Sequence, residues 1–248
     1  MVMKTLSQVV FYNKTNCDLL ASDAIFLGQL ISAVESGVHL LQMETMRLMN
    51  NLIASSALAA EKLCNHPGML EAIKSLFANP NFVILFRTAS AVNCLTRHAM
   101  SQPKIGTLLS RADIVNTMIS SRPTWSSEEL AATGIPVEQQ RLYGFLVTCA
   151  VGNSMGTIER KTWEVDEYHL ETAVLVLRAA RGNRKMAGVT WQMHPVLLTL
   201  RCLAVSDGNK KVMSSVRPVS LCFLFVWHTL HLSVCLGMDV GSFDTDMR

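Results

Sequence analysis

Residue types that bind metal ions lie close together near the C-terminus. His228, His231 and Cys235 are spaced i, i+3 and i+7, which places them on one face if this segment is a helix. Imidazole and thiolate groups bind Zn²⁺, and Cys222 would be the fourth ligand. A tetrahedral site, however, needs ligands that converge from more than one element, whereas these share one helix. We therefore expect packed or interfacial histidines and no metal site.

No catalytic signature occurs in the sequence. The nucleophile elbow G-x-S-x-G, the Walker A motif, H-E-x-x-H and G-x-G-x-x-G are all absent. The small-residue run from Gly152 to Gly156 lacks the Lys-Ser/Thr pair and the preceding strand that phosphate binding needs, so we interpret it as a loop. We therefore expect a protein that is not an enzyme and that has no cofactor.

Basic residues cluster at 178–185, where Arg178, Arg181, Arg184 and Lys185 lie close together. On one ridge they would attract an acidic partner or a nucleic-acid backbone. A solvated surface accounts for the same residues, and no aromatic residues interleave for base stacking. The formal net charge of the whole chain is only +3, which also makes nucleic acid an unlikely partner.

Composition favours a compact helical protein. Half of the 248 residues (50%) are apolar and 17% are charged, so the chain can bury a full core and is not expected to be disordered. Gly (13) and Pro (7) are sparse, which argues against a turn-rich all-β fold. The sequence therefore predicts the all-α class.

The cysteines and the N-terminal segment indicate the cellular compartment in which the protein is expected. The 7 cysteines form no C-x-x-C pair, and most lie in apolar helical patterns, so we expect buried thiols rather than disulfides. The segment before Asn16 lacks an uninterrupted apolar stretch and a small-residue cleavage site, so we expect no signal peptide. These features predict a cytoplasmic protein.

Apolar residues recur at helical spacing along most of the chain. The pattern predicts a first helix from Asp18 to Glu35, and Pro67 and Pro103 are expected to begin others. Asn79-Pro80 would end a helix. No β-sheet is expected between Asp18 and Val212. The remaining helices are predicted at about 40–55, 81–97, 137–151, 165–181, 194–206 and 219–236.

A short motif occurs three times. Met49–Ala54 aligns with Ala91–Thr96 and with Thr199–Ala204, and a Lys follows each copy after a polar gap. The leucines of the first two copies, Leu52 and Leu95, are 43 residues apart, and one unit of that length cannot bury its apolar face without stacked neighbours. The aligned leucines, which we expect to be buried at equivalent positions, are Leu52, Leu95 and Leu203.

Three segments carry a resemblance to a known family: ETMRLMNNLIASSALAAEKLCNHPGMLEAIKSLFANPN, FRTASAVNCLTRHAMSQPKIGTLL and VLLTLRCLAVSDGNKKVM. They resemble the armadillo-repeat family over about residues 40–217. The resemblance implies an armadillo-like α-solenoid, a right-handed superhelix of roughly four irregular units. The 108 residues between Leu95 and Leu203 exceed two regular units, so we expect an insertion at about 120–140. Within it, Ser126–Glu129 fits a capped helix or a phosphorylation site.

Armadillo proteins that bind nuclear-import peptides carry an asparagine before the leucine of the third helix, often with a tryptophan four residues earlier. Asn51 matches that asparagine, but Cys94 and Cys202 replace it in the other copies. The tryptophan positions hold Arg47, Ser90 and Leu198. The resemblance therefore does not extend to recognition of a nuclear-localisation peptide, and it leaves open the binding of a partner in the groove by other contacts.

The resemblance also implies where a partner would bind. The third helices, near 44–55, 81–97 and 195–205, would form a concave surface, so we expect a non-enzymatic scaffold for a partner protein or an extended peptide. Solvated or capping roles fit the same polar positions. The candidate contacts are Asn50, Asn51, Arg87, Asn93, Arg97 and Arg201.

The C-terminal segment departs from the repeat pattern. Residues 219–238 contain no Asp, Glu, Lys or Arg and are long enough to span a bilayer, with basic residues before them and acidic residues after them. His228 and His231 are unfavourable in lipid, so we expect a non-repeat apolar helix that covers the last unit. A tail-anchored, membrane-associated adaptor is the alternative, and a fragment of a longer array or a faulty gene model fits as well. The predicted domains are thus 1–217 and 218–248.

Overall fold

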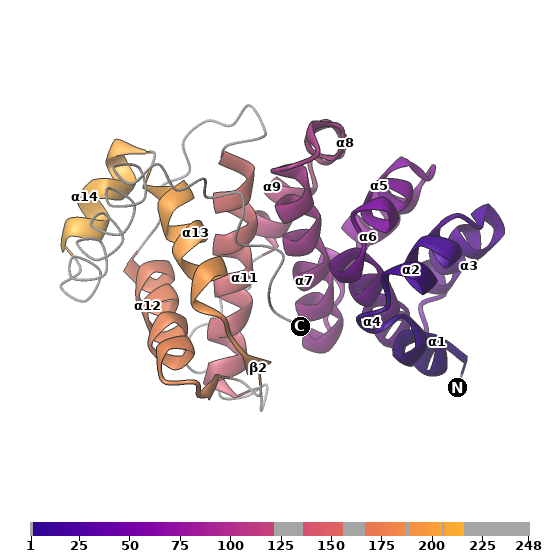
Figure 1. Ribbon diagram of the computed structural model, residues 1–248, viewed down its shortest axis with the longest axis horizontal. Coiled ribbons are helices and arrows are strands. Elements are labelled where there is room, and N and C mark those ends of the chain that lie inside the picture. Colours follow the sequence, from indigo (N-terminus) through magenta and orange to yellow (C-terminus); the bar gives the residue numbers. More distant parts are fainter. Residues whose placement is uncertain (1, 122–135, 156–166, 187–188, 205, 216–248) are drawn as a thin grey trace. The chain divides into compact units, whose positions relative to one another are not determined.

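The computed structural model describes residues 2–121, 136–155, 167–186, 189–204 and 206–215. Most of these residues are helical, which confirms the all-α class (Figure 1). The chain divides into two compact units, Met1–Trp163 and Glu164–Arg248, each with its own internal contacts.

The first unit is built of helices joined by short turns. Two of the predicted helices match closely, those at about 40–55 and 81–97, and Pro103 begins a helix as expected. The described elements are α1 (Val2–Val10), α2 (Lys14–Ala21), α3 (Ala24–Glu35), α4 (His39–Ser55), α5 (Ala57–Asn65), α6 (Met69–Ser75), the 3₁₀ turn η1 (Leu76–Ala78), α7 (Phe82–Ala99), α8 (Pro103–Arg111), α9 (Ile114–Ser120) and α11 (Val137–Met155).

The prediction of a single helix from Asp18 to Glu35 is wrong, because α2 and α3 meet at an angle of 87°. Asp23 is responsible for the break. Its Oδ1 accepts hydrogen bonds from the backbone N–H groups of Ile25 (2.9 Å) and Phe26 (3.1 Å). An aspartate in this position satisfies N–H groups at the start of a helix, so it favours a new helix over continuation of the old one.

Two turns next to prolines set the ends of short helices. The helix expected from Pro67 begins later, at Met69, because Gly68 adopts a left-handed backbone conformation (φ 79°) before it. Asn79-Pro80 ends the η1 turn as predicted, and the Asn81 side chain then caps α7 by accepting from the N–H groups of Val83 and Ile84.

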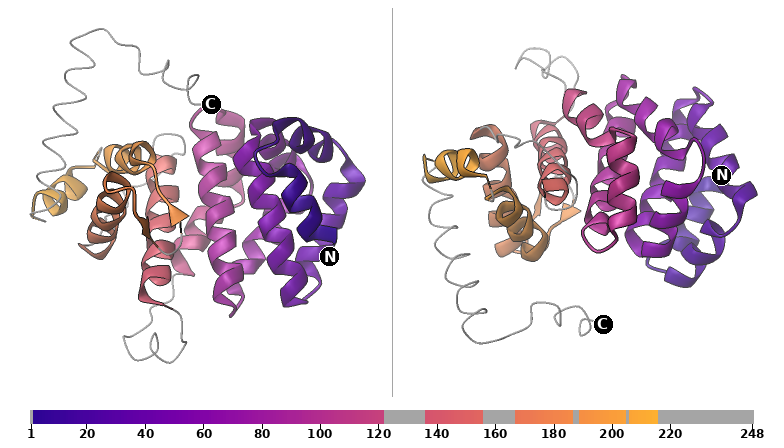
Figure 2. Two further views of the ribbon diagram at one scale, coloured as in Figure 1. Left: turned by 60° about the horizontal axis from the view of Figure 1, so that its bottom comes forward. Right: turned by 90° about the horizontal axis from the view of Figure 1, so that it is seen from above.

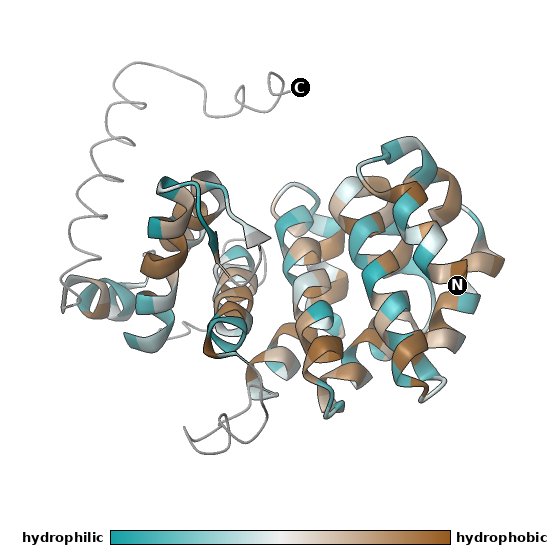
Figure 3. Cartoon of the chain, turned by 90° about the horizontal axis from the view of Figure 1, so that it is seen from below, coloured by the Kyte–Doolittle hydropathy of each residue, from teal (hydrophilic) through white to brown (hydrophobic). Residues whose placement is uncertain are grey.

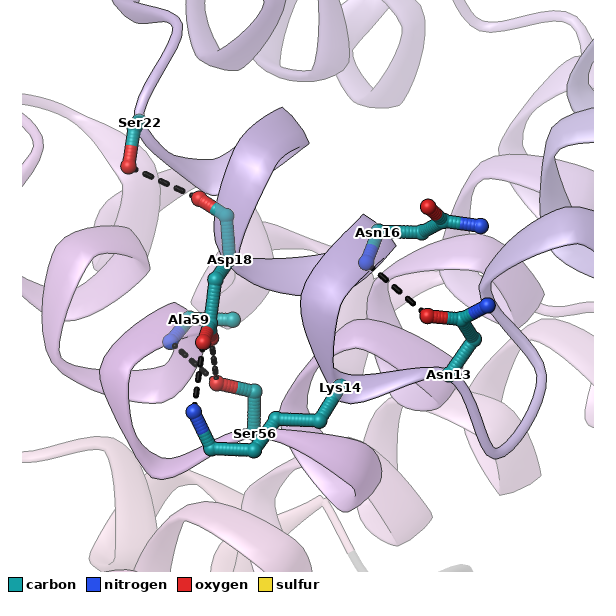
Figure 4. A network of polar contacts seen from close by, with 7 residues as sticks. All are labelled: Asn13, Lys14, Asn16, Asp18, Ser22, Ser56 and Ala59. Carbon is teal, nitrogen blue, oxygen red and sulfur yellow. Dashed lines mark hydrogen bonds and ion pairs between the residues drawn. The ribbon is translucent and has the colours of Figure 1, made fainter.

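A polar network holds the turn between α4 and α5 against α2 (Figure 4). The Ser56 hydroxyl accepts a hydrogen bond from the backbone N–H of Ala59 (3.1 Å) and donates one to the carboxylate of Asp18. Lys14 Nζ lies 2.5 Å from the same carboxylate. The network therefore joins the start of α5 to a helix that precedes it by almost 40 residues in the sequence.

The helices of the first unit contact one another in three rows. The long helices α4, α7 and α11 lie side by side, and α1 lies against α4 (Figures 1 and 2). In the second row α2 contacts α5 and α5 contacts α8, and in the third α3 contacts α6 and α6 contacts α9. Helices α5 and α8 have 9 residues each, and α6 and α9 have 7 each. A long helix followed by two short ones therefore occurs twice in succession.

Burial repeats with the same period as the sequence motif. From Gln42 to Ser56, every residue is buried, half-buried or exposed in agreement with the residue 43 positions later, between Leu85 and Ala99. Leu52 and Leu95 are both 0% exposed, which confirms their predicted burial. Hydrophobic and hydrophilic residues alternate around these helices, as expected when one side of each faces the core (Figure 3).

The second unit contains a small β-hairpin, so the prediction of no sheet is wrong there. Lys185 pairs with Thr190 and Met186 with Val189, and strands this short show no alternation that the sequence would reveal. The helix predicted at 194–206 ends at Leu203, which is 0% exposed as predicted, and the chain resumes as a separate helix. The elements are α12 (Glu167–Arg181), β1 (Lys185–Met186), β2 (Val189–Thr190), α13 (Met193–Leu203) and α14 (Asp207–Ser215).

Several predicted features lie outside the described residues. They include most of the insertion at about 120–140, the helix predicted at 219–236, the histidines and cysteines within it, and the domain boundary between 217 and 218. These features stay predictions.

Candidate partner-binding surface

Five of the six predicted contact residues lie together on two adjacent helices. Asn50 and Asn51 belong to α4, and Arg87, Asn93 and Arg97 belong to α7, which packs beside it. The sixth, Arg201, is exposed on α13 of the second unit.

These residues form part of a stripe that is repeated on both helices. At 100° per residue, positions 87, 90, 93, 94 and 97 share one side of α7, and the residues there are half-buried or exposed. The residues 43 positions earlier form the equivalent stripe on α4. We call these two stripes the α4–α7 surface. Its residues are Glu44, Arg47, Asn50, Asn51 and Ala54 on α4, and Arg87, Ser90, Asn93, Cys94 and Arg97 on α7.

Charged side chains tie the two stripes together at one end. Arg87 Nη1 lies 3.9 Å from a carboxylate oxygen of Glu44 and donates a hydrogen bond to the backbone carbonyl of Met43. Arg47 lies 3.8 Å from the other Glu44 oxygen, with 42% of its side chain exposed against 22% for Arg87. Burial lowers the pKa of Arg87, while the Glu44 carboxylate raises it and Arg47 lowers it further. Arg47 is thus the more accessible cation of this group.

Two buried acceptor oxygens of the surface have no hydrogen bond within the described structure. Asn50 Nδ2 donates to Ser90 Oγ (3.1 Å), which leaves Asn50 Oδ1 buried and without a hydrogen bond to any described residue. Glu44 Oε2 is likewise buried without a hydrogen bond in the described structure. A buried acceptor without a donor costs free energy, so a hydrogen bond from a bound molecule would be favourable.

The other two asparagines of the surface pair with neighbouring helices. Asn51 Nδ2 donates to the carbonyl oxygen (2.9 Å) and to Oγ (2.8 Å) of Ser7 on α1. Asn93 Oδ1 accepts from Asn153 Nδ2 of α11 (3.3 Å), which also reaches Thr96 Oγ1 (3.3 Å). These amides therefore connect the row of long helices.

Asn153 is a residue that sequence reasoning misplaced. The loop predicted from Gly152 to Gly156 is wrong for Gly152 to Met155, which form the last turn of α11. Two glycines made the segment look like a loop, although Asn153 follows an apolar run and stands two residues after Val151, as Asn51 stands two after Met49. That spacing was the available signal.

The described residues do not support a metal site or a reactive thiol. No group of three or more His, Cys, Asp or Glu side chains within them is placed to hold a metal ion. The five described cysteines are free thiols, and burial raises the pKa of each that has a resolved shift, Cys64 to about 12. Burial also raises the pKa of Cys94, the thiol on the α4–α7 surface, so this thiol stays protonated at neutral pH.

Comparison with known protein families, curated proteins and solved structures finds no match to this chain. In the described part, no single helix is both long and apolar enough to cross a membrane, and α2 and α3 pass that test only together, as a bent pair.

Proposed function

We propose that this protein is a non-enzymatic scaffold that binds an extended segment of a partner protein on the α4–α7 surface. The proposal includes an armadillo-like α-solenoid, a right-handed superhelix of irregular units. The observation that carries it is the 43-residue repeat of burial, because it gives two adjacent helices the same half-buried polar stripe. The three rows of contacting helices support it further.

The dimensions of the two stripes suit an extended chain. Packed helices lie about 8–10 Å apart, and an extended segment rises about 3.3 Å per residue, so roughly three residues of a partner bridge α4 and α7. Glu44 Oε2 and Asn50 Oδ1 would accept hydrogen bonds from its backbone N–H groups. Arg47 and Arg97 would meet its acidic side chains, since both are accessible cations at the edge of the surface.

The free thiols bear on where the scaffold works. Five described cysteines without a disulfide support the proposal of a reducing, cytoplasmic compartment.

Selection from a displayed peptide library on the purified full chain tests the proposal. Enriched peptides are expected to bind the double variant Arg47→Ala, Arg97→Ala about tenfold more weakly, the effect of losing contacts worth about 1.4 kcal/mol. The matched control is Lys62→Ala, Lys104→Ala, which removes the same charge from exposed positions on α5 and α8. Equal losses in both double variants, or peptides insensitive to both, would contradict the proposed surface.

A further inference from the structure

Four exposed basic residues gather where α12 ends and the hairpin begins. Arg178 and Arg181 are in the last turn of α12, Arg184 follows the helix, and Lys185 begins β1. We call these four residues the basic corner. Arg178 and Arg181 are one helical turn apart, so both side chains leave the same side of α12.

The backbone of the corner is fixed by a helix-ending motif. Arg184 N–H donates to the carbonyl of Ala179 (2.9 Å), and Asn183 N–H donates to that of Ala180 (3.1 Å). Asn183 itself adopts a left-handed conformation (φ 48°), which asparagine tolerates better than most residues. This pair of hydrogen bonds is the Schellman arrangement, and it sets the direction in which Arg184 leaves the helix.

The absence of a side chain at residue 182 lets Arg184 fold back over the helix end. A Cβ atom at Gly182 would lie 3.0 Å from Arg184 Nε and 3.6 Å from Arg184 Nη2. The same Cβ would lie 3.4 Å from the carbonyl oxygen of Arg178. The guanidinium of Arg184 therefore lies beside the last turn of the helix, which carries Arg178 and Arg181.

The corner has no counter-ion among the described residues. None of its four cations forms an ion pair there, and the acidic residues of α12, Glu167 and Glu171, lie in the first half of the helix. The helix dipole favours Arg178 and Arg181 in the last turn, but it gives no reason for two further cations beyond the helix. Like charges this close repel one another, and an anionic partner would relieve that repulsion.

We propose that the basic corner docks an acidic segment of a partner protein, with Asp and Glu carboxylates meeting the guanidinium groups one by one. A planar guanidinium matches a carboxylate through two parallel hydrogen bonds. A single buried phosphate fits less well, because a helix C-terminus presents carbonyl oxygens rather than N–H donors.

The composition of the basic corner disfavours two other anionic partners, a nucleic acid and a membrane surface. Residues 178–186 include no aromatic side chain on which a base would stack. They also include no exposed large apolar side chain that would enter a membrane surface.

Fluorescence anisotropy of the full chain with a labelled poly-glutamate peptide tests the inference. Binding is expected to weaken roughly tenfold or more as ionic strength rises from low to physiological, because exposed charges are screened. Arg181→Glu with Arg184→Glu is expected to abolish most of the binding. The matched control Lys62→Glu with Lys104→Glu makes the same charge change at exposed positions of the first unit and is expected to leave affinity within about twofold. Equal weakening by the control would overturn the inference.

Additional variants and ligands distinguish the other possible results of this binding experiment. If the double charge reversal does not fold by circular dichroism, Arg181→Gln and Arg184→Gln singly carry the test, and unchanged affinity in both would contradict the corner. Gly182→Ala retains every charge but displaces the Arg184 guanidinium, so it is expected to weaken binding several-fold.

Tighter binding of oligothymidylate or of phosphatidylserine vesicles, with the same sensitivity to charge reversal, would overturn the choice of an acidic peptide. The residues differ from those of the α4–α7 surface, so failure here is independent of the proposed function.

Discussion

Leu95 holds the position on α7 that Leu52 holds on α4, and neither side chain is exposed to solvent. Both leucines lie one residue after the α4–α7 surface positions Asn51 and Cys94, so the polar stripe and the core residue recur together. The stripe is therefore positioned by the same packing that buries the leucines. Substitution of either leucine is therefore expected to lower the stability of the fold, and to weaken partner binding only as a consequence of that loss.

Leu95→Ala is expected to lower the free energy of unfolding by about 2–5 kcal/mol, because it removes buried methyl groups and leaves a cavity. Val83→Ala on the same helix is the control, since 42% of Val83 is exposed, and it should cost about 0.5 kcal/mol or less. Urea unfolding followed by circular dichroism measures both. An unchanged midpoint for Leu95→Ala would show that α7 does not pack in the register described.

The repeat and its buried leucines could be predicted because apolar spacing reports directly which side of a helix is buried. The break at Asp23 could not, since an aspartate at the edge of a helical pattern reads equally as an exposed residue or as a cap. The hairpin at 185–190 was missed because two-residue strands carry no periodicity.

The hydrogen-bond partners of the predicted site residues could not be predicted from the sequence either. Asn51 and Ser7 are 44 residues apart, and Asn153 and Thr96 are 57 apart. Which side chains meet across such distances depends on how far each helix is shifted along its neighbour. Sequence periodicity indicates which residues share one side of a helix but not that shift, so the hydrogen bonds of these residues could not be predicted.

The stability of the first unit is expected to fall as the pH falls through about 6.5, the ordinary pKa of histidine. His98 on α7 lies with Nε2 2.7 Å from the carbonyl oxygen of Ile53 on α4. Burial lowers the pKa of His98; the hydrogen bond to Ile53 opposes this shift, and Arg97 adds to it. Between the two pKa values the unfolded chain binds a proton that the folded chain does not, so the free energy of unfolding is largest above this window and decreases below it.

Unfolding of His98→Gln across the same pH range isolates this contribution. The variant is expected to show a weaker decrease in stability toward acid than the parent chain. His39→Gln, at an exposed position of α4, is the control and should retain the full pH dependence. Parallel pH curves for the parent and His98→Gln would refute the assignment.

Ser56→Ala is expected to destabilise the turn between α4 and α5 by about 0.5–2 kcal/mol, the usual effect of removing a helix cap. The change removes the acceptor for Ala59 N–H and the donor to Asp18 (Figure 4). Lys14→Ala leaves the cap in place and breaks only an ion pair whose lysine is 68% exposed, so it should cost less than about 1 kcal/mol. Chemical denaturation compares the two, and Ser56→Thr should restore most of the loss. A larger effect of Lys14→Ala than of Ser56→Ala would reverse the proposed order of importance.

Removal of residues 219–248 is expected to make the remaining chain aggregate or unfold less cooperatively. The segment 219–238 has no charged residue, and a stack of helical units exposes an apolar face at its end unless something covers it. The full chain is then expected in the fraction that stays in solution without detergent, and the truncated chain in the pellet. Centrifugation of both, with carbonate extraction of membranes, measures the difference. A full chain recovered only in carbonate-resistant membranes, together with a truncated chain that stays in solution, would instead establish the segment as a tail anchor, because only an inserted helix resists extraction while its removal frees a folded domain.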